Sequence, residues 1–391
     1  MLTRISPTLD PITRRDFLGR CGRGLAICAC SALLPVCTTS RPARSAEIEK
    51  GFIGQKRSPY FEPLDNQVIR CTLCPHGCEV GPAERGLCDV RGNIDGQYYS
   101  FVYGNPCTVQ IDPIEKKPFY HVLPASRAFS LATTGCNFDC KFCQNWEISQ
   151  ARPDDTYNYR LSPDEVISSA LQYKSEVIAS TYVEPVIFIE YMLEIGRLAK
   201  PQPLLKVMHS NGFINAEPLE DLCDVLDAAC IDLKGFTEDF YQTMTGGSLA
   251  PVLNTLKVLK SRRVQTEIVN LMVPGKNDDM QQVRAMCQWI YKELGPDVPL
   301  HFSRFYPRYK LKGIRPTAVS TLEKAREVAN DEGLRFVYVG NVPEHPGGHT
   351  YCPGCKKILI HRIGYRVKVQ GLKDGKCQNC GGSIAGIWKS H

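Results

Sequence analysis

Short apolar runs alternate with helical patterns between residue 126 and about residue 345. Seven of these runs have the length and composition of strands: Ala128 to Thr133, Val177 to Tyr182, Leu204 to Met208, Ala228 to Leu233, Val264 to Leu271, Leu300 to Phe305 and Leu334 to Val339. Ser162-Pro163-Asp164-Glu165 predicts a helix start, because it combines a capping box with proline at the first helical position, and Ser320-Thr-Leu-Glu323 repeats the box. Gly333 is placed to end the helix that follows. This alternation favours an α/β fold with a parallel sheet covered by helices.

Three cysteines follow the first predicted strand and the turn residue Gly135, with the spacing Cys136-x3-Cys140-x2-Cys143. Thiolates are soft ligands that suit iron–sulfur clusters, and three of them leave one iron of a 4Fe-4S cluster without a protein ligand. An iron left open in this way can bind a chelating substrate. The alternatives are three reduced cysteines of a hydrophobic core, or a zinc knuckle that lacks one ligand.

The cysteine loop resembles the signature of the radical S-adenosylmethionine (SAM) superfamily, and Phe142 matches the aromatic position that lies against adenine there. The run from Thr134 to Gln150 is similar to the radical enzyme of the AmmeMemoRadiSam system, a relative of the pyruvate formate-lyase activating enzymes. The resemblance extends from about Cys71 to Trp388, and Asp112-Pro-Ile-Glu-Lys-Lys-Pro118 also belongs to it. It implies a partial, open (β/α)6 barrel, a 4Fe-4S cluster on the loop, and SAM bound to the open iron through its amino and carboxylate groups.

Polar residues stand near the ends of successive strands, where barrels gather their functional groups. Tyr182-Val-Glu184-Pro185 resembles the Gly-Gly-Glu-Pro position of the superfamily, which implies that Glu184 accepts hydrogen bonds from the ammonium of SAM; valine at 183 replaces the expected glycine. Further candidates for contacts with SAM are Asn211 in Ser210-Asn211-Gly212, Asp232 and Lys234 in Asp232-Leu-Lys234, Glu267 with Asn270, and His301. Asp232 and Lys234 alternate with Leu233, so they face the same side of a strand. The alternatives are a solvated ion pair for these two residues and a satisfied core histidine for His301.

Two further groups of cysteines flank this region. The spacing Cys71-x2-Cys74-x3-Cys78-x9-Cys88 can close a tetrahedral Zn(II) site or hold a second cluster, and the ligand type does not separate the two. The pairs Cys352-x2-Cys355 and Cys377-x2-Cys380 are arranged as in a zinc ribbon; zinc is favoured, although a rubredoxin-like iron fits the same four sulfurs. The remaining Cys107, Cys223, Cys230 and Cys287 are interpreted as small buried hydrophobic residues.

Residues 1–46 are predicted to be a targeting segment. Thr13-Arg14-Arg15-Asp16-Phe17-Leu18 is a twin-arginine pattern, and the apolar run Leu25 to Val36 that follows is too short to span a membrane. We therefore expect export to the periplasm or cell envelope, and no transmembrane protein. The alternatives are that the segment is an uncleaved anchor or that the start site is misplaced, and the alternative location is the cytoplasm. The segment holds seven arginines and two aspartates, a surplus of +5, which leaves about +1 of the total +6 for the rest. A basic nucleic-acid footprint is therefore not expected.

The chain is thus divided into a signal segment (1–46), an N-terminal cysteine-rich module (47–125), a radical SAM core (126–345) and a zinc-ribbon-like module (346–391). The resemblance implies that an external electron donor reduces the cluster, that SAM is cleaved to methionine and a 5′-deoxyadenosyl radical, and that the radical abstracts hydrogen from a substrate. It also points to activation of a partner protein and to Memo-like and AMMECR-like partners. The alternatives are an iron–sulfur electron-transfer protein without SAM chemistry, and a metal-stabilised scaffold or nucleic-acid-binding protein, which the near-neutral charge of residues 47–391 disfavours.

Overall fold

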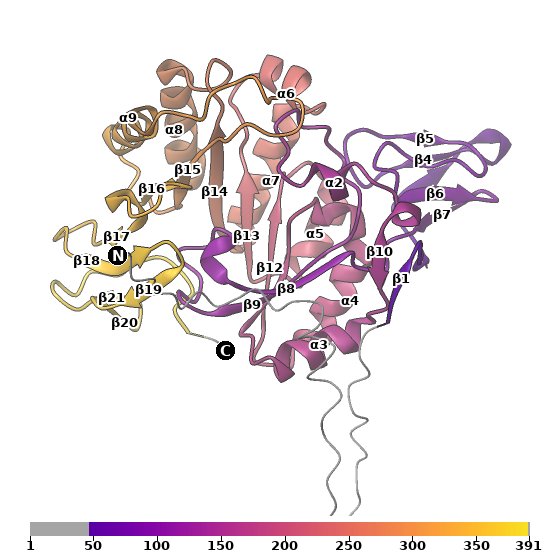
Figure 1. The fold of residues 1–391 in the computed structure, drawn as a ribbon, viewed down its shortest axis with the longest axis horizontal. Coiled ribbons are helices and arrows are strands. Elements are labelled where there is room, and N and C mark those ends of the chain that lie inside the picture. Colours follow the sequence, from indigo (N-terminus) through magenta and orange to yellow (C-terminus); the bar gives the residue numbers. More distant parts are fainter. Residues whose placement is uncertain (1–46, 390–391) are drawn as a thin grey trace, which may run out of the picture.

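A sheet of eight strands forms the centre of the molecule, in the order β16-β15-β14-β13-β12-β11-β9-β8 (Figure 1). The computed structural model describes residues 47–389, so the predicted twin-arginine segment lies outside the described residues. The sheet consists of β8 (Thr108–Pro113), β9 (Arg127–Ala132), β11 (Val177–Ser180), β12 (Leu205–Ser210), β13 (Ala228–Asp232), β14 (Gln265–Met272), β15 (Leu300–Arg304) and β16 (Val337–Gly340). All neighbours pair in parallel except β8, which runs antiparallel to β9.

The seven predicted strands are confirmed, and together they form the parallel part of the sheet. This part has one strand more than the six that the resemblance implied. Most strand ends lie within one residue of the prediction, and three differ by more. β11 ends at Ser180, two residues before the predicted end at Tyr182. β12 continues past Met208 to Ser210, and β16 begins only at Val337, because the backbone N–H of Leu334 still bonds to the carbonyl of Ala329 in the last turn of the preceding helix.

The helices between the strands pack their apolar residues against one face of the sheet and form the main hydrophobic core. They are α2 (Trp146–Ser149), α3 (Pro163–Gln172), α4 (Ile189–Ala199), α5 (Ala216–Cys223), α6 (Glu238–Met244), α7 (Leu249–Ser261), α8 (Met280–Leu294) and α9 (Val319–Asp331). Short 3₁₀ helices are η1 (Asp65–Gln67), η2 (Ile114–Lys116), η3 (Pro153–Asp155), η4 (Pro185–Phe188) and η5 (Pro346–Gly348).

The predicted helix boundaries are confirmed in two of three places. Ser162 and Glu165 form the expected capping box at the start of α3, and Gly333 adopts a φ of +91° just after α9. The capping box at Ser320 is wrong, because α9 begins at Val319 without a side-chain cap. Thr317 explains the earlier start: its hydroxyl donates to the carbonyl of Met272 at 2.6 Å and so anchors the chain to the sheet just before the helix.

The N-terminal strand group (β2–β7, residues 56–100) forms two small sheets beside the core, and β1 (Ile48–Lys50) pairs with β10 (Tyr157–Tyr159) below them. Its strands are β2 (Lys56–Arg57), β3 (Phe61–Pro63), β4 (Ile69–Cys71), β5 (Glu79–Val80), β6 (Arg91–Ile94) and β7 (Gln97–Ser100). Arg91 attaches the group to α4 through a two-point ion pair with Glu190, in which the two side chains are 1% and 6% exposed. Removal of one partner would leave a buried charge uncompensated, at a cost of about 3–5 kcal/mol.

The C-terminal strand group (β17–β21, residues 350–377) lies at the opposite end of the molecule (Figure 1). Its strands are β17 (Thr350–Tyr351), β18 (Ile358–Ile363), β19 (Arg366–Val369), β20 (Leu372–Lys373) and β21 (Lys376–Cys377). Leu359 and Ile360 pack against Phe336 and Tyr338 beside and on β16. Within residues 47–389, no helix has the length and apolar character that a membrane span requires.

The second face of the sheet is covered by two segments that are far apart in the sequence. Phe119 and Val122 pack into the apolar cluster on this face, and Ile387 packs against the same cluster. The backbone N–H of Ile387 bonds to the carbonyl of His121, and that of Leu123 bonds to the carbonyl of Ile387, both at 2.8 Å. We call this the inner face of the sheet.

His121 links the cover of the inner face to the sheet as a neutral side chain. Its Nδ1 lies 2.6 Å from the carbonyl oxygen of Ala385 and its Nε2 lies 2.7 Å from the hydroxyl of Tyr338. A carbonyl can only accept, so Nδ1 carries the proton and Nε2 accepts from Tyr338. Burial lowers the pKa of His121 to about 4.

We expect His121 to make the fold acid-sensitive between its ordinary pKa of 6.5 and its folded pKa of about 4. In that range the unfolded chain takes up a proton on this side chain and the folded chain does not. The free energy of unfolding therefore decreases as the pH is lowered, by up to about 3 kcal/mol. Urea denaturation at several pH values checks this. The difference in stability between the wild type and His121→Gln should shrink as the pH falls; a constant difference would show that His121 is not held neutral.

Candidate functional site

The cysteine loop, residues 136–143, follows β9 and is fixed by hydrogen bonds to two neighbouring segments. The backbone N–H of Asp139 donates to the carbonyl of Thr245 at 2.9 Å, at the end of α6. The side-chain amide of Asn137 donates to the carbonyl of Phe213 at 2.9 Å, in the turn after β12. The positions of the three thiols are therefore set by strands and helices on both sides of the loop.

Two glycines allow the loop to approach its neighbours. Gly135 has a φ of +88°, and a Cβ on it would lie 2.6 Å from the carbonyl oxygen of Cys88. A Cβ on Gly247 would lie 2.1 Å from the ring of Phe138. Real Cβ contacts are never this short, so both positions require glycine. Gly135 in particular lets the cysteine loop lie directly against the N-terminal strand group.

The three thiols of the loop suit an iron–sulfur cluster by type and by surroundings. Cys140 is 7% exposed, and Cys136 and Cys143 are half-buried. Burial raises the pKa of Cys136, and raises that of Cys140 to about 12, so that these thiols are protonated until a metal displaces the protons. Three soft ligands on one loop fit a 4Fe-4S cluster in which one iron is open to another ligand.

Glu184 places a buried carboxylate beside the loop. It lies between β11 and η4, is 2% exposed, and interacts electrostatically with Cys136. Its oxygens accept three hydrogen bonds: from Val186 N–H at 3.0 Å, Ser210 hydroxyl at 2.6 Å and Asn211 N–H at 2.7 Å. Burial raises its pKa, and the three donors oppose that shift. An ionised carboxylate accepts about four hydrogen bonds, so one position remains for a ligand.

Asp232 and Lys234 face the same side of the chain after β13, as the alternation predicted. Lys234 Nζ lies 2.8 Å from Asp232 Oδ2, and His209 Nε2 on β12 lies 3.0 Å from Asp232 Oδ1. Burial alone would raise the pKa of Asp232, but Lys234 and His209 outweigh it and hold that pKa well below its usual range. Lys234 also interacts electrostatically with Cys140, so this charged group belongs to the surroundings of the loop.

Phe142 of the loop and Asn211 beside the loop are both buried. The ring of Phe142 lies 6.1 Å from that of Phe240 on α6, and Lys234 Nζ is 5.9 Å from its centroid. The side chain of Asn211 donates to Asn137 Oδ1 at 2.8 Å, and its own Oδ1 accepts from the N–H of Phe213 at 2.8 Å. Asn211 thereby ties the end of β12 to the cysteine loop.

Glu267 and His301 lie in a separate buried network on the inner face. His301 Nε2 is 2.8 Å from Glu267 Oε2, and the carboxylate also accepts the backbone N–H groups of Tyr120 and His121. Glu267 is fully buried, and the ring of Tyr338 stacks on His301 at 4.9 Å between centroids. The structure thus gives both residues protein partners, and their predicted contacts with SAM stay predictions.

The structure does not place Asn270 with Glu267. The two residues are three apart on β14 and so face opposite sides of the sheet. Asn270 Nδ2 donates to the carbonyl of Leu233 at 2.7 Å and contacts the sulfur of Met286 on α8. The two candidates thus point away from each other, and the predicted contact of Asn270 with SAM stays a prediction.

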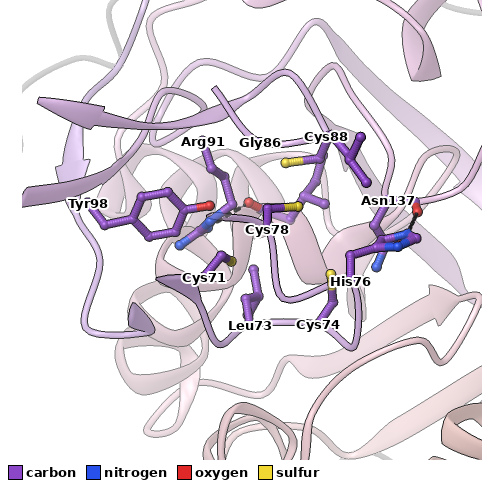
Figure 2. Close-up of a pocket in the computed structure, with 12 residues that line it drawn as sticks. Cys71, Leu73, Cys74, His76, Cys78, Gly86, Cys88, Arg91, Tyr98 and Asn137 are labelled. Carbon is purple, nitrogen blue, oxygen red and sulfur yellow. Dashed lines mark hydrogen bonds between the residues drawn. The ribbon is translucent and has the colours of Figure 1, made fainter. Parts of the chain in front are cut away.

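The two outer cysteine groups differ in spacing. The C-terminal four, Cys352, Cys355, Cys377 and Cys380, hold all their sulfur atoms within 4.8 Å of one another, and within residues 47–389 no other group of cysteines does so. A single zinc ion with Zn–S bonds of about 2.3 Å separates its sulfurs by roughly 3.8 Å, which matches this spacing. The N-terminal four surround one cavity with a wider spacing (Figure 2).

Two groups of polar side chains were missed by the sequence reasoning. His209 pairs with Asp232, but the predicted strand ended one residue earlier, at Met208. A strand predicted to continue by one residue would have included His209. Asp112, Lys117 and Tyr182 form a second cluster: Lys117 Nζ is 2.5 Å from Asp112 Oδ2 and 3.8 Å from the centroid of the Tyr182 ring. The motif around Asp112 was singled out, but a sequence contains no signal that brings Lys117 onto Tyr182.

Comparison with known proteins adds family relationships to this geometry. The family model of the radical SAM superfamily matches residues 130–290, a range that includes the cysteine loop, Glu184 and the Asp232–Lys234 pair. The uncharacterized protein MJ0808 of Methanocaldococcus jannaschii is 42% identical over 331 residues, which cover 84% of this chain and 98% of that protein. The pyruvate formate-lyase 1-activating enzyme of Escherichia coli K12 is 22% identical over 226 residues, which cover 52% of this chain and 89% of that enzyme.

Among solved structures, a radical SAM methyltransferase from Sphaerobacter thermophilus aligns with 75% of this chain and 78% of its own. The TM-score is 0.46 and the identity is 11%, a likeness that carries no functional argument.

We expect Cys355→Ser to remove the metal of the C-terminal four and to lower stability, because binding of a structural metal contributes to folding free energy. Metal analysis should find about one equivalent less per chain, and thermal unfolding should occur at a lower temperature. Cys223→Ser, on α5, is the matched control and should retain the metal. Unchanged metal content in Cys355→Ser would contradict the assignment of the C-terminal site.

Proposed function

Because this chain belongs to the radical SAM superfamily, we propose that it cleaves SAM by a radical mechanism at a 4Fe-4S cluster held by Cys136, Cys140 and Cys143. The observation that carries the proposal is the convergence of Glu184 and Lys234 on one loop: Glu184 is joined to it through Asn211, which bonds to Asn137, and Lys234 Nζ lies 5.9 Å from the centroid of the Phe142 ring. When bound, the cluster supplies the single electron that breaks a carbon–sulfur bond of SAM, which yields methionine and a 5′-deoxyadenosyl radical. An electron carrier without a substrate would not need these charged groups.

Glu184 is suited to hold the ammonium of SAM. Its three internal donors fix both oxygens, and one acceptor position is left on Oε2. A carboxylate oriented before the ligand arrives loses little side-chain entropy on binding. Its low exposure also keeps water from competing for the same position.

Lys234 is suited to hold the carboxylate or a ribose hydroxyl of SAM. Its partner Asp232 and the burial of the pair keep the ammonium in one place. Burial alone would lower the pKa of Lys234, but the charge of Asp232 outweighs burial and raises that pKa. The Phe142 ring, within 5.9 Å of Lys234 Nζ, offers an apolar surface for adenine. Asn211 acts as a positioning residue, because it holds the loop through Asn137.

We also propose that the hydrogen donor is a partner protein. The relation to the pyruvate formate-lyase activating enzymes supports this, at 22% identity over about half of the chain. The motifs Cys71 to Cys78 and Asp112 to Pro118 support membership of the AmmeMemoRadiSam group and partners of the Memo-like and AMMECR-like kind. Zinc in the C-terminal group is supported by the sulfur spacing. Export by the twin-arginine route rests on Thr13 to Leu18.

The decisive experiment is the assay of the full chain for 5′-deoxyadenosine under anaerobic conditions, after reconstitution with iron and sulfide and reduction with dithionite. We expect the product in the wild type, at least a hundredfold less in Cys140→Ala, and unchanged formation in the matched control Cys223→Ala. A fully loaded and reduced wild type without product, or turnover retained in Cys140→Ala, would overturn the proposal in favour of electron transfer without SAM chemistry.

Glu184→Gln tests the contact with the ammonium of SAM. Because a hydrogen bond to a charged group contributes about 1.5–3 kcal/mol, we expect the KM for SAM to rise roughly ten- to hundredfold. Glu217→Gln, on the exposed side of α5, should leave KM unchanged. Urea unfolding of both variants separates loss of binding from loss of fold. A KM that stays at the wild-type value in a folded Glu184→Gln would remove Glu184 from the SAM site.

A further inference from the structure

Cys71, Cys74, Cys78 and Cys88 line one enclosed cavity in the N-terminal strand group, and their sulfur atoms lie around a common space (Figure 2). The volume open to the centre of a water molecule in this cavity is about 10 Å³. Four thiols that already formed the shell of a single zinc ion would leave no such space, because their sulfurs would be in mutual contact.

The spacing of the sulfurs separates this site from the C-terminal one. Among the described cysteines, the C-terminal four reach single-ion spacing, with Cys352 and Cys380 Sγ atoms 3.5 Å apart, and the N-terminal four do not. The three cysteines of the loop do not reach it either. In a 4Fe-4S cluster each thiolate binds a different iron, so its ligands stand farther apart than those of one ion. The N-terminal four therefore match the loop, and not the zinc-like site.

Groups around the cavity are arranged to stabilise thiolates bound to a metal. Three thiols accept backbone N–H groups: Cys74 from His76, Cys78 from Leu87 and Cys88 from Val90. Arg91 lines the cavity, is 1% exposed, and its Nε has no hydrogen-bond partner within the described residues. A buried donor without a partner is costly, and an anionic group in the cavity would satisfy it.

The cysteine loop itself forms part of the cavity wall. Asn137, which follows Cys136, lines the cavity itself. His76 Nε2 lies 2.7 Å from the backbone oxygen of Asn137 (Figure 2). Gly135, which precedes Cys136, lies so close to the backbone of Cys88 that no side chain fits between them.

We propose that Cys71, Cys74, Cys78 and Cys88 bind a second 4Fe-4S cluster, through which an electron reaches the cluster of the loop. The electron comes from an external low-potential, one-electron donor protein of the flavin or iron–sulfur class. The donor is oxidised by one electron and the loop cluster is reduced by one, while the second cluster returns to its starting state. The presence of the second cluster does not depend on the proposed function. The role of the second cluster as a relay rests on the proposed function.

Iron and acid-labile sulfide analysis of the anaerobic full chain tests the site directly. We expect about eight irons and eight sulfides per chain, and about one zinc from the C-terminal four. About four irons with two zincs would overturn the proposal, because zinc would then occupy the N-terminal four. This measurement needs no variant and no SAM turnover, so it stands even if the proposed function fails.

A variant without the loop ligands isolates the second cluster. In Cys136→Ala/Cys140→Ala/Cys143→Ala, iron should fall by about half, and dithionite should still generate the electron paramagnetic resonance signal of one reduced cluster. Cys107→Ala/Cys223→Ala/Cys287→Ala is the matched control and should retain all of the iron. A folded loop variant without iron would overturn the site.

The distance between the clusters is tested in the fully reduced wild type. Two clusters that share the cysteine loop as a wall should broaden each other's resonance signals by magnetic coupling, and the loop variant should lose this broadening. Two sharp, independent signals in the wild type would overturn the role as a relay while leaving the second cluster in place.

Discussion

Parallel pairing of β9 and β11 to β16 brings the carboxyl ends of seven strands to one edge of the sheet, and the candidate site depends on this edge. Glu184 follows β11, Asn211 follows β12, and Asp232 ends β13. None of these residues is close to the cysteine loop in the sequence, and each reaches it because its strand ends at the same level. A slip of register by one residue would turn these side chains to the other face of the sheet.

Burial of charge is the second requirement that shapes the molecule. Glu184 and the Arg91–Glu190 pair are nearly excluded from water, and each charged group makes at least two hydrogen bonds. Such groups contribute little net stability compared with apolar residues of the same size, but loss of one partner is severe. These pairs therefore fix positions more than they stabilise the fold, which is what a site for a charged cosubstrate needs.

The sequence predicted the central sheet well because its strands are buried on both faces and contain continuous apolar runs, as in Ala228 to Ile231. The loop cysteines and Glu184 could be named as candidates because they belong to short motifs, and their roles stay predictions. Sequence reasoning missed His209, whose role depends on a strand end, and Lys117 on Tyr182, whose contact depends on tertiary packing. The Ser320 box was wrong because the anchoring of Thr317 to Met272, a contact between distant segments, outweighed a local capping preference.

The kind of metal site at the N-terminal cysteines also depends on tertiary packing, which the sequence does not show. Four thiols in 18 residues predict a metal site, but the number of metal ions depends on how far apart the sulfurs are held, and that distance is set by the fold. Here the turns of the N-terminal strand group hold Cys71 to Cys88 around an open space, whereas the knuckles that contain Cys352 and Cys377 bring their sulfurs together.

The cover of the inner face has a consequence for the order of folding. His121 and Ala385 are hydrogen-bonded although they are 264 residues apart in the chain. Contacts of such long sequence separation form slowly, because a large loop must close before they contribute any free energy. On a ribosome, the strands of the sheet leave the exit tunnel well before Ala385 does. The apolar residues of the inner face therefore lack this part of their cover until the segment around Ala385 has been made, and exposed apolar surface of this kind makes a nascent chain prone to aggregation.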